Sequence, residues 1–145
     1  MSTRDIEVSV RNRLTRLPDR GSYDRETLYE VLDAGRICHV AWADGSRPMC
    51  LPTAYGRWED DLILHGAAKG RFLEAMAGGA ELCISVTLLD GLVLARSTFH
   101  SSMNYRSVVI FGRGERIVDP ADKVKALDLL VDHLAPRRAL EVRPT

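Results

Sequence analysis

Short runs of β-forming residues separated by tight turns are the feature that most constrains this fold. The run RICHVAWA (36–43) is followed by Asp44-Gly45-Ser46 and then by PMCLPTAY (48–55). An Asp-Gly pair between two apolar runs is a strong hairpin signal, because its turn geometry suits antiparallel strands. Four further runs, at 62–66, 81–89, 92–98 and 105–118, bring the expected strands to six. The pattern predicts a mainly β fold with an antiparallel sheet, which such chains often close into a barrel.

Two details refine the expected strands. Pro48 and Pro52 lack the N–H group that a strand ladder needs, so the second strand is expected to be partly an edge or to be interrupted. Asp90-Gly91 is expected to form a turn between the runs 81–89 and 92–98.

Three helices are expected beside the strands. Asp24 is suited to cap a helix over 25–34, and Pro120 is suited to the first turn of a helix that begins after Asp119. A short helix over about 69–77, ended by Gly78-Gly79, is the third.

Length and composition indicate a single domain. The chain has 145 residues with 46% hydrophobic content, which suffices for one sizeable core. We expect a charged arm over residues 1–20 and the domain over 21–145. The 20 basic and 20 acidic residues balance, which argues against a nucleic-acid binder because such affinity rests on neutralised phosphates.

The chain also lacks several signals. It has no apolar run as long as the roughly 18 residues of a membrane span, and its N-terminus does not resemble a secretory signal, so we expect no membrane contact and a cytoplasmic location. Cys38, Cys50 and Cys83 form no Cys-x-x-Cys pair and are expected to be buried free thiols. The four histidines are scattered, so no metal site is expected.

The segment HGAAKGR (65–71) is a candidate anion site. Its small residues would let a ligand approach the backbone, and the N–H groups at a helix start favour negative charge. Lys69 and Arg71 would add full charges. The segment lacks the P-loop and GxGxxG patterns, and a tight connection with two solvated cations remains the alternative interpretation.

A second unusual segment is ARSTFHSSMNYRS (95–107), which is polar although apolar strands precede and follow it. It is either a surface loop or part of a pocket in which a few polar groups orient a ligand. His100 is the candidate catalytic residue here, and a solvated loop histidine is the alternative.

The order GSRPMCLPTAY, DDLILHGAAKGRFLEAM, ELCISVTLL and LLDGLVLARSTFHSSMNYRSVVIFG resembles the pyridoxamine 5′-phosphate oxidase-like flavoproteins with a split β-barrel. It is most similar to their flavin-nucleotide-binding branch, which includes nitroimidazole-resistance reductases. The resemblance spans about residues 15–145. It implies a six-stranded antiparallel Greek-key barrel, and a homodimer that holds FMN at the subunit interface and acts on a small-molecule substrate.

The resemblance also implies roles for individual residues. The cationic turn, with His65, Gly66, Lys69, Gly70 and Arg71, would cradle the FMN phosphate. The strand residues Leu51, Pro52, Thr53, Ala54 and Tyr55 would run along the flavin ring. Asn104 and Tyr105, with His100, would approach the ring or the substrate.

The chain departs from the oxidases of this family in three places. Their Ser-Arg-Lys-Gly motif is Ala67-Ala68-Lys69-Gly70 here, and their arginine near the start of the ring-contacting strand is replaced by Leu51 or Pro52. The C-terminal pyridoxal-phosphate residues have no counterpart, so oxidation of vitamin B6 is not expected. Relatives in this branch commonly continue beyond the last helix with another strand, so the chain is expected to be either a short member or one that lacks a C-terminal strand.

Three hypotheses about function stay open at this point. The first is an FMN-dependent oxidoreductase. The second is a flavin-binding carrier or sensor without turnover, and the third is a haem- or deazaflavin-binding relative of the same fold.

Overall fold

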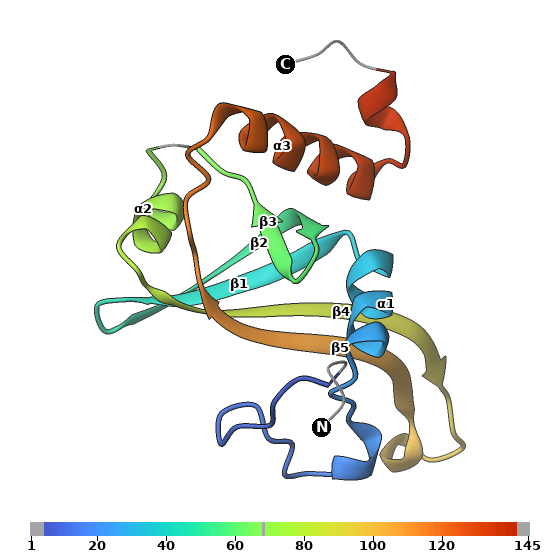
Figure 1. Cartoon of the computed structure of the whole chain (residues 1–145). Coiled ribbons are helices and arrows are strands. Elements are labelled where there is room, and N and C mark those ends of the chain that lie inside the picture. Colours follow the sequence, from blue (N-terminus) through green and yellow to red (C-terminus); the bar gives the residue numbers. More distant parts are fainter. Residues whose placement is uncertain (1–4, 68, 142–145) are drawn as a thin grey trace. The chain divides into compact units, whose positions relative to one another are not determined.

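The computed structural model describes residues 5–67 and 69–141. The strands are β1 (Ile37–Asp44), β2 (Arg47–Trp58), β3 (Asp61–Leu64), β4 (Glu81–Val93) and β5 (Ser102–Arg113) (Figure 1). The helices are α1 (Arg25–Ala34), α2 (Arg71–Ala77) and α3 (Pro120–Leu134), with short 3-10 turns at Pro18–Arg20, Thr98–His100 and Arg138–Leu140. No helix of the described residues is long and apolar enough to cross a membrane.

The strands form one antiparallel sheet in the order β3-β2-β1-β4-β5. The fold is therefore mixed α and β, with five strands in the described residues rather than the six expected in a mainly β fold, whereas the expected antiparallel sheet is confirmed. The missing strand arises because β4 continues without a break from the segment expected at 81–89 to Val93, while residues 94–98, expected in a separate strand, are not in a strand.

The turn expected at Asp90-Gly91 does not form. Gly91 does not adopt the positive φ that a primed hairpin turn requires. Instead, the Asp90 carboxylate accepts hydrogen bonds from Arg106 on β5, from Nη2 at 2.8 Å and Nε at 3.0 Å. The chain reverses only after Val93, and β5 begins at Ser102 inside the segment expected to be an irregular insert. Pairing between strands outweighs the local turn preference here.

The pairing of β2 explains its two prolines. Residues 47–54 pair with β1, whereas β3 pairs only with Tyr55 through Trp58. Within the described residues, the first part of β2 therefore has a partner on one side only. Pro48 and Pro52 lie four residues apart, so their nitrogens face the same edge of the strand. The prediction of a partial edge strand is confirmed.

The helix ends follow local sequence signals. Asp24 caps α1, with its carboxylate accepting from the Thr27 N–H at 2.9 Å, and Asp119 caps α3, accepting from the N–H groups of Ala121 and Asp122. The sequence predicted the cap at Asp24, a helix start at Asp119-Pro120, and the hairpin at Gly45, which takes a φ of 62°. It did not indicate that Asp119 caps α3. The helix expected at about 69–77 begins at Arg71.

The described chain divides into two compact units. One contains residues 5–35 and 87–108, and the other contains 36–86 and 109–141. The expected division into an arm and a domain stays a prediction. The first unit holds an N-terminal segment in which the Tyr23 hydroxyl donates to the Asn12 carbonyl at 2.8 Å and accepts from the Leu14 N–H at 2.9 Å.

The second unit carries most of the buried core. On β1 the buried residues Cys38, Val40 and Trp42 alternate with exposed or half-buried ones, as a strand with one covered face requires. Leu82, Ile84 and Val86 repeat the pattern on β4. Helix α3 contributes Ala126 and Leu130, which pack with Ile63 of β3.

Candidate functional site

The cationic turn predicted to bind phosphate lies between β3 and α2. His65 and Lys69 are exposed, and Gly70 is the N-cap residue of α2. The Gly70 N–H donates to the Ala67 carbonyl at 2.8 Å, which makes the turn tight. A Cβ on Gly70 would lie 3.0 Å from that carbonyl oxygen, so a small residue is needed here for packing.

Lys69 and Arg71 are both exposed, and within residues 5–67 and 69–141 neither side chain forms a hydrogen bond or ion pair. Their charges are therefore available to a ligand. The structure brings both cations to the start of α2, as the sequence predicted, while α2 itself has only two turns. Gly66 lies in the same turn and packs near Phe72 and Leu73.

The segment predicted to contact a ring lies on β2 in the same unit. Leu51 and Pro52 are exposed, and Thr53 and Ala54 are half-buried. Within the described residues these four have a strand partner on one side only. Tyr55 differs, because its side chain is fully buried and its ring packs on His133 with centroids 4.7 Å apart. The structure thus places Tyr55 in the core, next to the four accessible residues.

The polar segment belongs to the other compact unit. His100 ends the 3-10 turn Thr98–His100, its Nδ1 lies 3.2 Å from the Ser97 hydroxyl, and its ring meets Phe99 edge-on. Asn104 and Tyr105 are exposed residues of β5. These three are close in the chain, and their position relative to the cationic turn stays a prediction.

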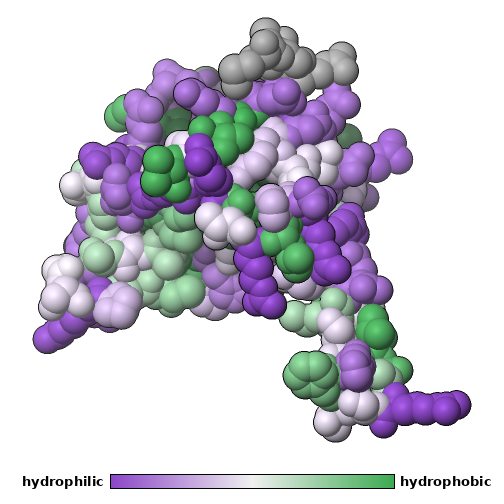
Figure 2. Space-filling model, turned by 90° about the horizontal axis from the view of Figure 1, so that it is seen from below, coloured by the Kyte–Doolittle hydropathy of each residue, from purple (hydrophilic) through white to green (hydrophobic). Residues whose placement is uncertain are grey.

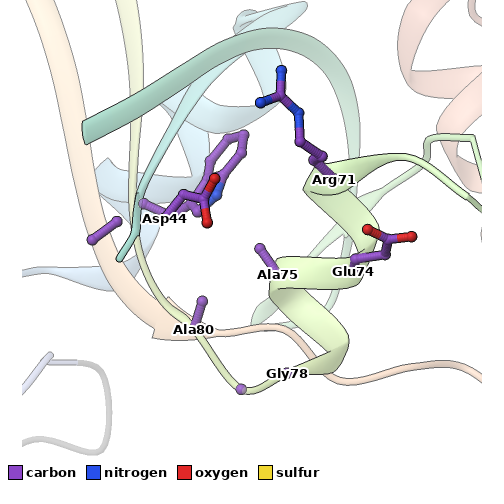
Figure 3. Close-up of a pocket in the computed structure, with 9 residues that line it drawn as sticks. Asp44, Arg71, Glu74, Ala75, Gly78 and Ala80 are labelled. Carbon is purple, nitrogen blue, oxygen red and sulfur yellow. The ribbon is translucent and has the colours of Figure 1, made fainter. Parts of the chain in front are cut away.

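A pocket that the sequence did not indicate opens between the end of β1 and helix α2. Its volume is about 490 Å³. The charged residues at its wall are Asp44, Arg71 and Glu74 (Figure 3). The remaining lining residues are small or aromatic: Trp42, Ala43, Ala75, Gly78, Gly79 and Ala80. In the sequence, Asp44 indicated only a turn, and nothing local shows that it lies beside α2.

The pocket has an apolar floor that is held in place by the core. Trp42 is buried to 8% exposure, and its ring packs on Phe72 of α2 with centroids 5.5 Å apart. At the far end, α2 closes with Gly79 at a φ of 76°, the Ala80 N–H donating to the Ala75 carbonyl and the Gly79 N–H to the Met76 carbonyl. This is the Schellman pattern, in which glycine is favoured at the left-handed position.

The cysteines differ in their environments. Cys38 is buried, and burial raises the pKa of its thiol to about 11, so the reactive thiolate is scarce at neutral pH. Cys83 is half-buried and Cys50 is exposed, which corrects the expectation that all three are buried. All three are free thiols. The described residues contain no group of three or more His, Cys, Asp or Glu that could hold a metal ion.

The residues at the turn are compatible with the flavin phosphate expected from the sequence. Two exposed cations lack partners among the described residues, and Gly70 adds no side chain at the start of α2. The first part of β2 has a strand partner on one side only within the described residues. Phosphate oxygens prefer such charged donors and N–H groups. The chemistry of the donor set therefore fits a phosphate-bearing cofactor.

Comparison with solved structures identifies relatives of this fold. The FAD- and haem-binding protein of Mycobacterium smegmatis is 42% identical, with a TM-score of 0.80 over 86% of this chain and 60% of that one. The flavocytochrome Anf3 of Azotobacter vinelandii is 37% identical, with a TM-score of 0.84 over 94% of this chain and 64% of that one. The chain therefore spans less than two thirds of either relative.

A third structure is more distant. A protein of Bacteroides thetaiotaomicron VPI-5482, described as a 5-nitroimidazole antibiotic resistance protein, is 27% identical, with a TM-score of 0.64 over 76% of this chain and 66% of that one. No curated protein sequence matches the chain significantly. A family model described as pyridoxamine 5′-phosphate oxidase matches residues 24–145. These residues include strands β1 to β5 and helices α1 to α3, and only the N-terminal segment lies outside the match. This chain belongs to the pyridoxamine 5′-phosphate oxidase family and has its split-barrel fold.

Proposed function

We propose that the chain is a flavin-binding redox protein that oxidises or reduces a small molecule. One observation carries the proposal. The chain is 42% identical to a protein described as binding FAD and haem, and 37% identical to a flavocytochrome, with close agreement of the fold in both cases. The family match over residues 24–145 and the unpaired cations at the start of α2 support it.

The phosphate of the flavin would lie at the cationic turn. Lys69 and Arg71 would supply charge, and the backbone at Gly66 and Gly70 would approach closely. Leu51 through Ala54 on β2 would orient the ring through backbone groups. The flavin supplies the electron or hydride transfer, and the protein supplies orientation and electrostatics.

The sequence predicted FMN, whereas the relative from Mycobacterium smegmatis is described as an FAD-binding protein. Both cofactors share the flavin mononucleotide moiety, and it is this moiety that the cationic turn would hold. We further propose a homodimer, with His100, Asn104 and Tyr105 close to the flavin or to the substrate. The substrate would be a small electron-poor molecule such as a nitro compound or a quinone.

Cofactor analysis of the purified protein tests this function. We expect flavin absorbance bands in the spectrum, and chromatography after denaturation to identify FMN or FAD. We also expect the bound flavin to turn over with a quinone or nitro acceptor in the presence of a nicotinamide donor. Failure of the flavin-free protein to bind either flavin would overturn the proposal. Stable binding without turnover would indicate a carrier or sensor instead.

Haem is a second candidate cofactor, because both similar proteins are described by names that include haem or a cytochrome. A histidine commonly holds haem iron. The exposed histidines His39, His65 and His100 are the candidates in this chain. Titration with haemin should produce an intense Soret band that is lost on replacing one of these histidines. A spectrum of free haemin at every ratio would exclude this candidate.

A further inference from the structure

The pocket beside α2 carries charges that the flavin phosphate alone does not explain. Asp44 is the last residue of β1, and Figure 3 shows its carboxylate directed toward the helix, opposite Ala75. Arg71 rises from the first turn of α2 at the rim of the same space. Within the described parts of the chain, neither side chain forms a hydrogen bond or ion pair. A carboxylate and a guanidinium are thus both available to one ligand.

The walls restrict what that ligand can be. Trp42, Ala75 and Ala80 give an apolar surface, and Gly78 adds no side chain. A volume of about 490 Å³ accommodates a group of nucleoside size. The Asp44 carboxylate and the Arg71 guanidinium face the pocket, and Glu74 adds a second negative charge on the outer side of α2, so a fully anionic ligand is disfavoured away from Arg71.

These groups match the parts of a nucleotide. An acidic side chain is the usual partner of a free ribose hydroxyl in dinucleotide sites, and it disfavours a phosphate at that position. Arginine grips phosphate with two parallel hydrogen bonds. An aromatic side chain suits a purine base, and Trp42 is the aromatic residue in the pocket lining. Arg71 lies two residues from Lys69 in the chain and lines the pocket, so it links the cationic turn to the pocket.

We propose that this pocket binds the adenosine phosphate moiety of a dinucleotide, with Asp44 on the ribose hydroxyls and Arg71 on the adjoining phosphate. The first molecule that could supply this moiety is FAD, through its adenylate half, and for FAD the assignment rests on the proposed flavin function. A free nicotinamide dinucleotide carries the same moiety and is the second source.

Equilibrium binding of FAD, FMN and ADP to the flavin-free protein tests the assignment. We expect FAD to bind at least about tenfold more tightly than FMN, because only FAD fills the pocket. Asp44→Asn should weaken FAD about tenfold and leave FMN within about twofold, since the loss of one hydrogen bond to a charged group has that size. Asparagine preserves the hairpin, because Asn-Gly and Asp-Gly are both favoured there.

Glu74→Gln is the matched control. It makes the same change of charge on the same pocket, but Figure 3 shows the Glu74 carboxylate turned to the outer side of α2. FAD affinity should therefore change less than about threefold. Equal losses for the two variants would assign the effect to net charge and overturn the direct contact.

Binding of ADP distinguishes FAD from a free nicotinamide dinucleotide as the ligand of the pocket. It also tests the pocket assignment separately from the flavin function. Calorimetric binding of ADP that displaces FAD but not FMN indicates the adenylate of FAD. ADP binding to protein already loaded with FAD indicates a free dinucleotide. If neither flavin binds but ADP binds and Asp44→Asn weakens it, the pocket assignment holds while the flavin function fails. Equal FAD and FMN affinities together with no ADP binding would overturn the assignment.

Discussion

Lys69 and Arg71 are the residues on which the phosphate site depends. Replacing both with alanine should weaken FMN by about a hundredfold or more, because each charge-assisted hydrogen bond contributes about 1.5–3 kcal/mol. Riboflavin lacks the phosphate, so its affinity should change much less. Fluorescence titration of both ligands measures the two losses. Equal losses would mean that the turn does not bind phosphate.

His100 is exposed, and its ring nitrogen lies beside Ser97 in a short turn. If it donates to the reduced flavin, His100→Ala should lower the flavin potential by tens of millivolts, since a tenfold change in a two-electron equilibrium is about 30 mV. Flavin affinity should stay within a few-fold. Potentiometry of both proteins between pH 5.5 and 8 measures the two potentials. An unchanged potential across this range would leave His100 a solvated loop residue.

Gly56 on β2 allows helix α3 to approach the sheet. A Cβ at this position would lie 2.9 Å from the Leu130 Cα, which is backbone and cannot move aside by itself. Gly56→Ala should therefore destabilise the fold by about 1–3 kcal/mol, the usual cost of overpacking. Urea denaturation of the flavin-free protein measures this. Gly112→Ala on β5 is the control, because a Cβ there meets nothing within 4 Å, and an equal cost for the two variants would refute the packing explanation.

At the scale of elements, the Asp90–Arg106 pair joins β4 and β5. The hydrogen bond from Arg106 is the main cause that lowers the pKa of Asp90 below its ordinary value of 3.8. A carboxyl whose pKa is lower in the folded state stabilises the protein above its unfolded pKa, and this contribution is lost as the pH falls through the folded pKa. Both side chains are exposed, so the effect is small.

Asp90→Asn removes this contribution at every pH. We therefore expect the denaturation midpoint of the variant to lie below that of the wild type at pH 7, with a gap that closes as the pH falls past 3.8. Asp128→Asn on α3 changes the same charge at an exposed position and should show a smaller gap. A gap of constant size down to low pH would show that the stabilisation does not depend on the charge of Asp90.

At the scale of the whole molecule, hydrophobic side chains reach the surface (Figure 2). Several belong to β4, β5 and their connection, with exposed fractions from 52% to 90%: Leu89, Leu92, Leu94, Phe99, Met103 and Tyr105. Exposed apolar surface of this kind often marks an interface. The balanced charge of the chain also favours association.

We expect light scattering at micromolar concentration to give about twice the mass of the 16.2 kDa chain. A stable dimer of this type should bury more than roughly 1,000 Å². A monomeric mass for protein that still binds flavin tightly would contradict the homodimer.

Much of the candidate site could be predicted from the sequence, because its signals are local. Asp24 and Asp119 cap their helices through contacts within three residues, and Gly45 forms its hairpin through its own backbone freedom. Lys69 and Arg71 are brought together by chain proximity alone. The unpaired edge of β2 followed from proline chemistry, which does not depend on the neighbouring strand.

Tertiary structure alone decided the rest, because it depends on residues distant in sequence. Asp90-Gly91 has the composition of a turn, yet pairing with β5 and Arg106 keeps it in a strand. Asp44 and Arg71 line one pocket only because the end of β1 lies beside α2, where Trp42 packs on Phe72. The sequence by itself determined helix ends, hairpins and the cationic turn through short-range geometry. Contacts between distant segments determined the number of strands, the burial of Tyr55 and the pocket, since their energies arise only once the sheet and helices have packed.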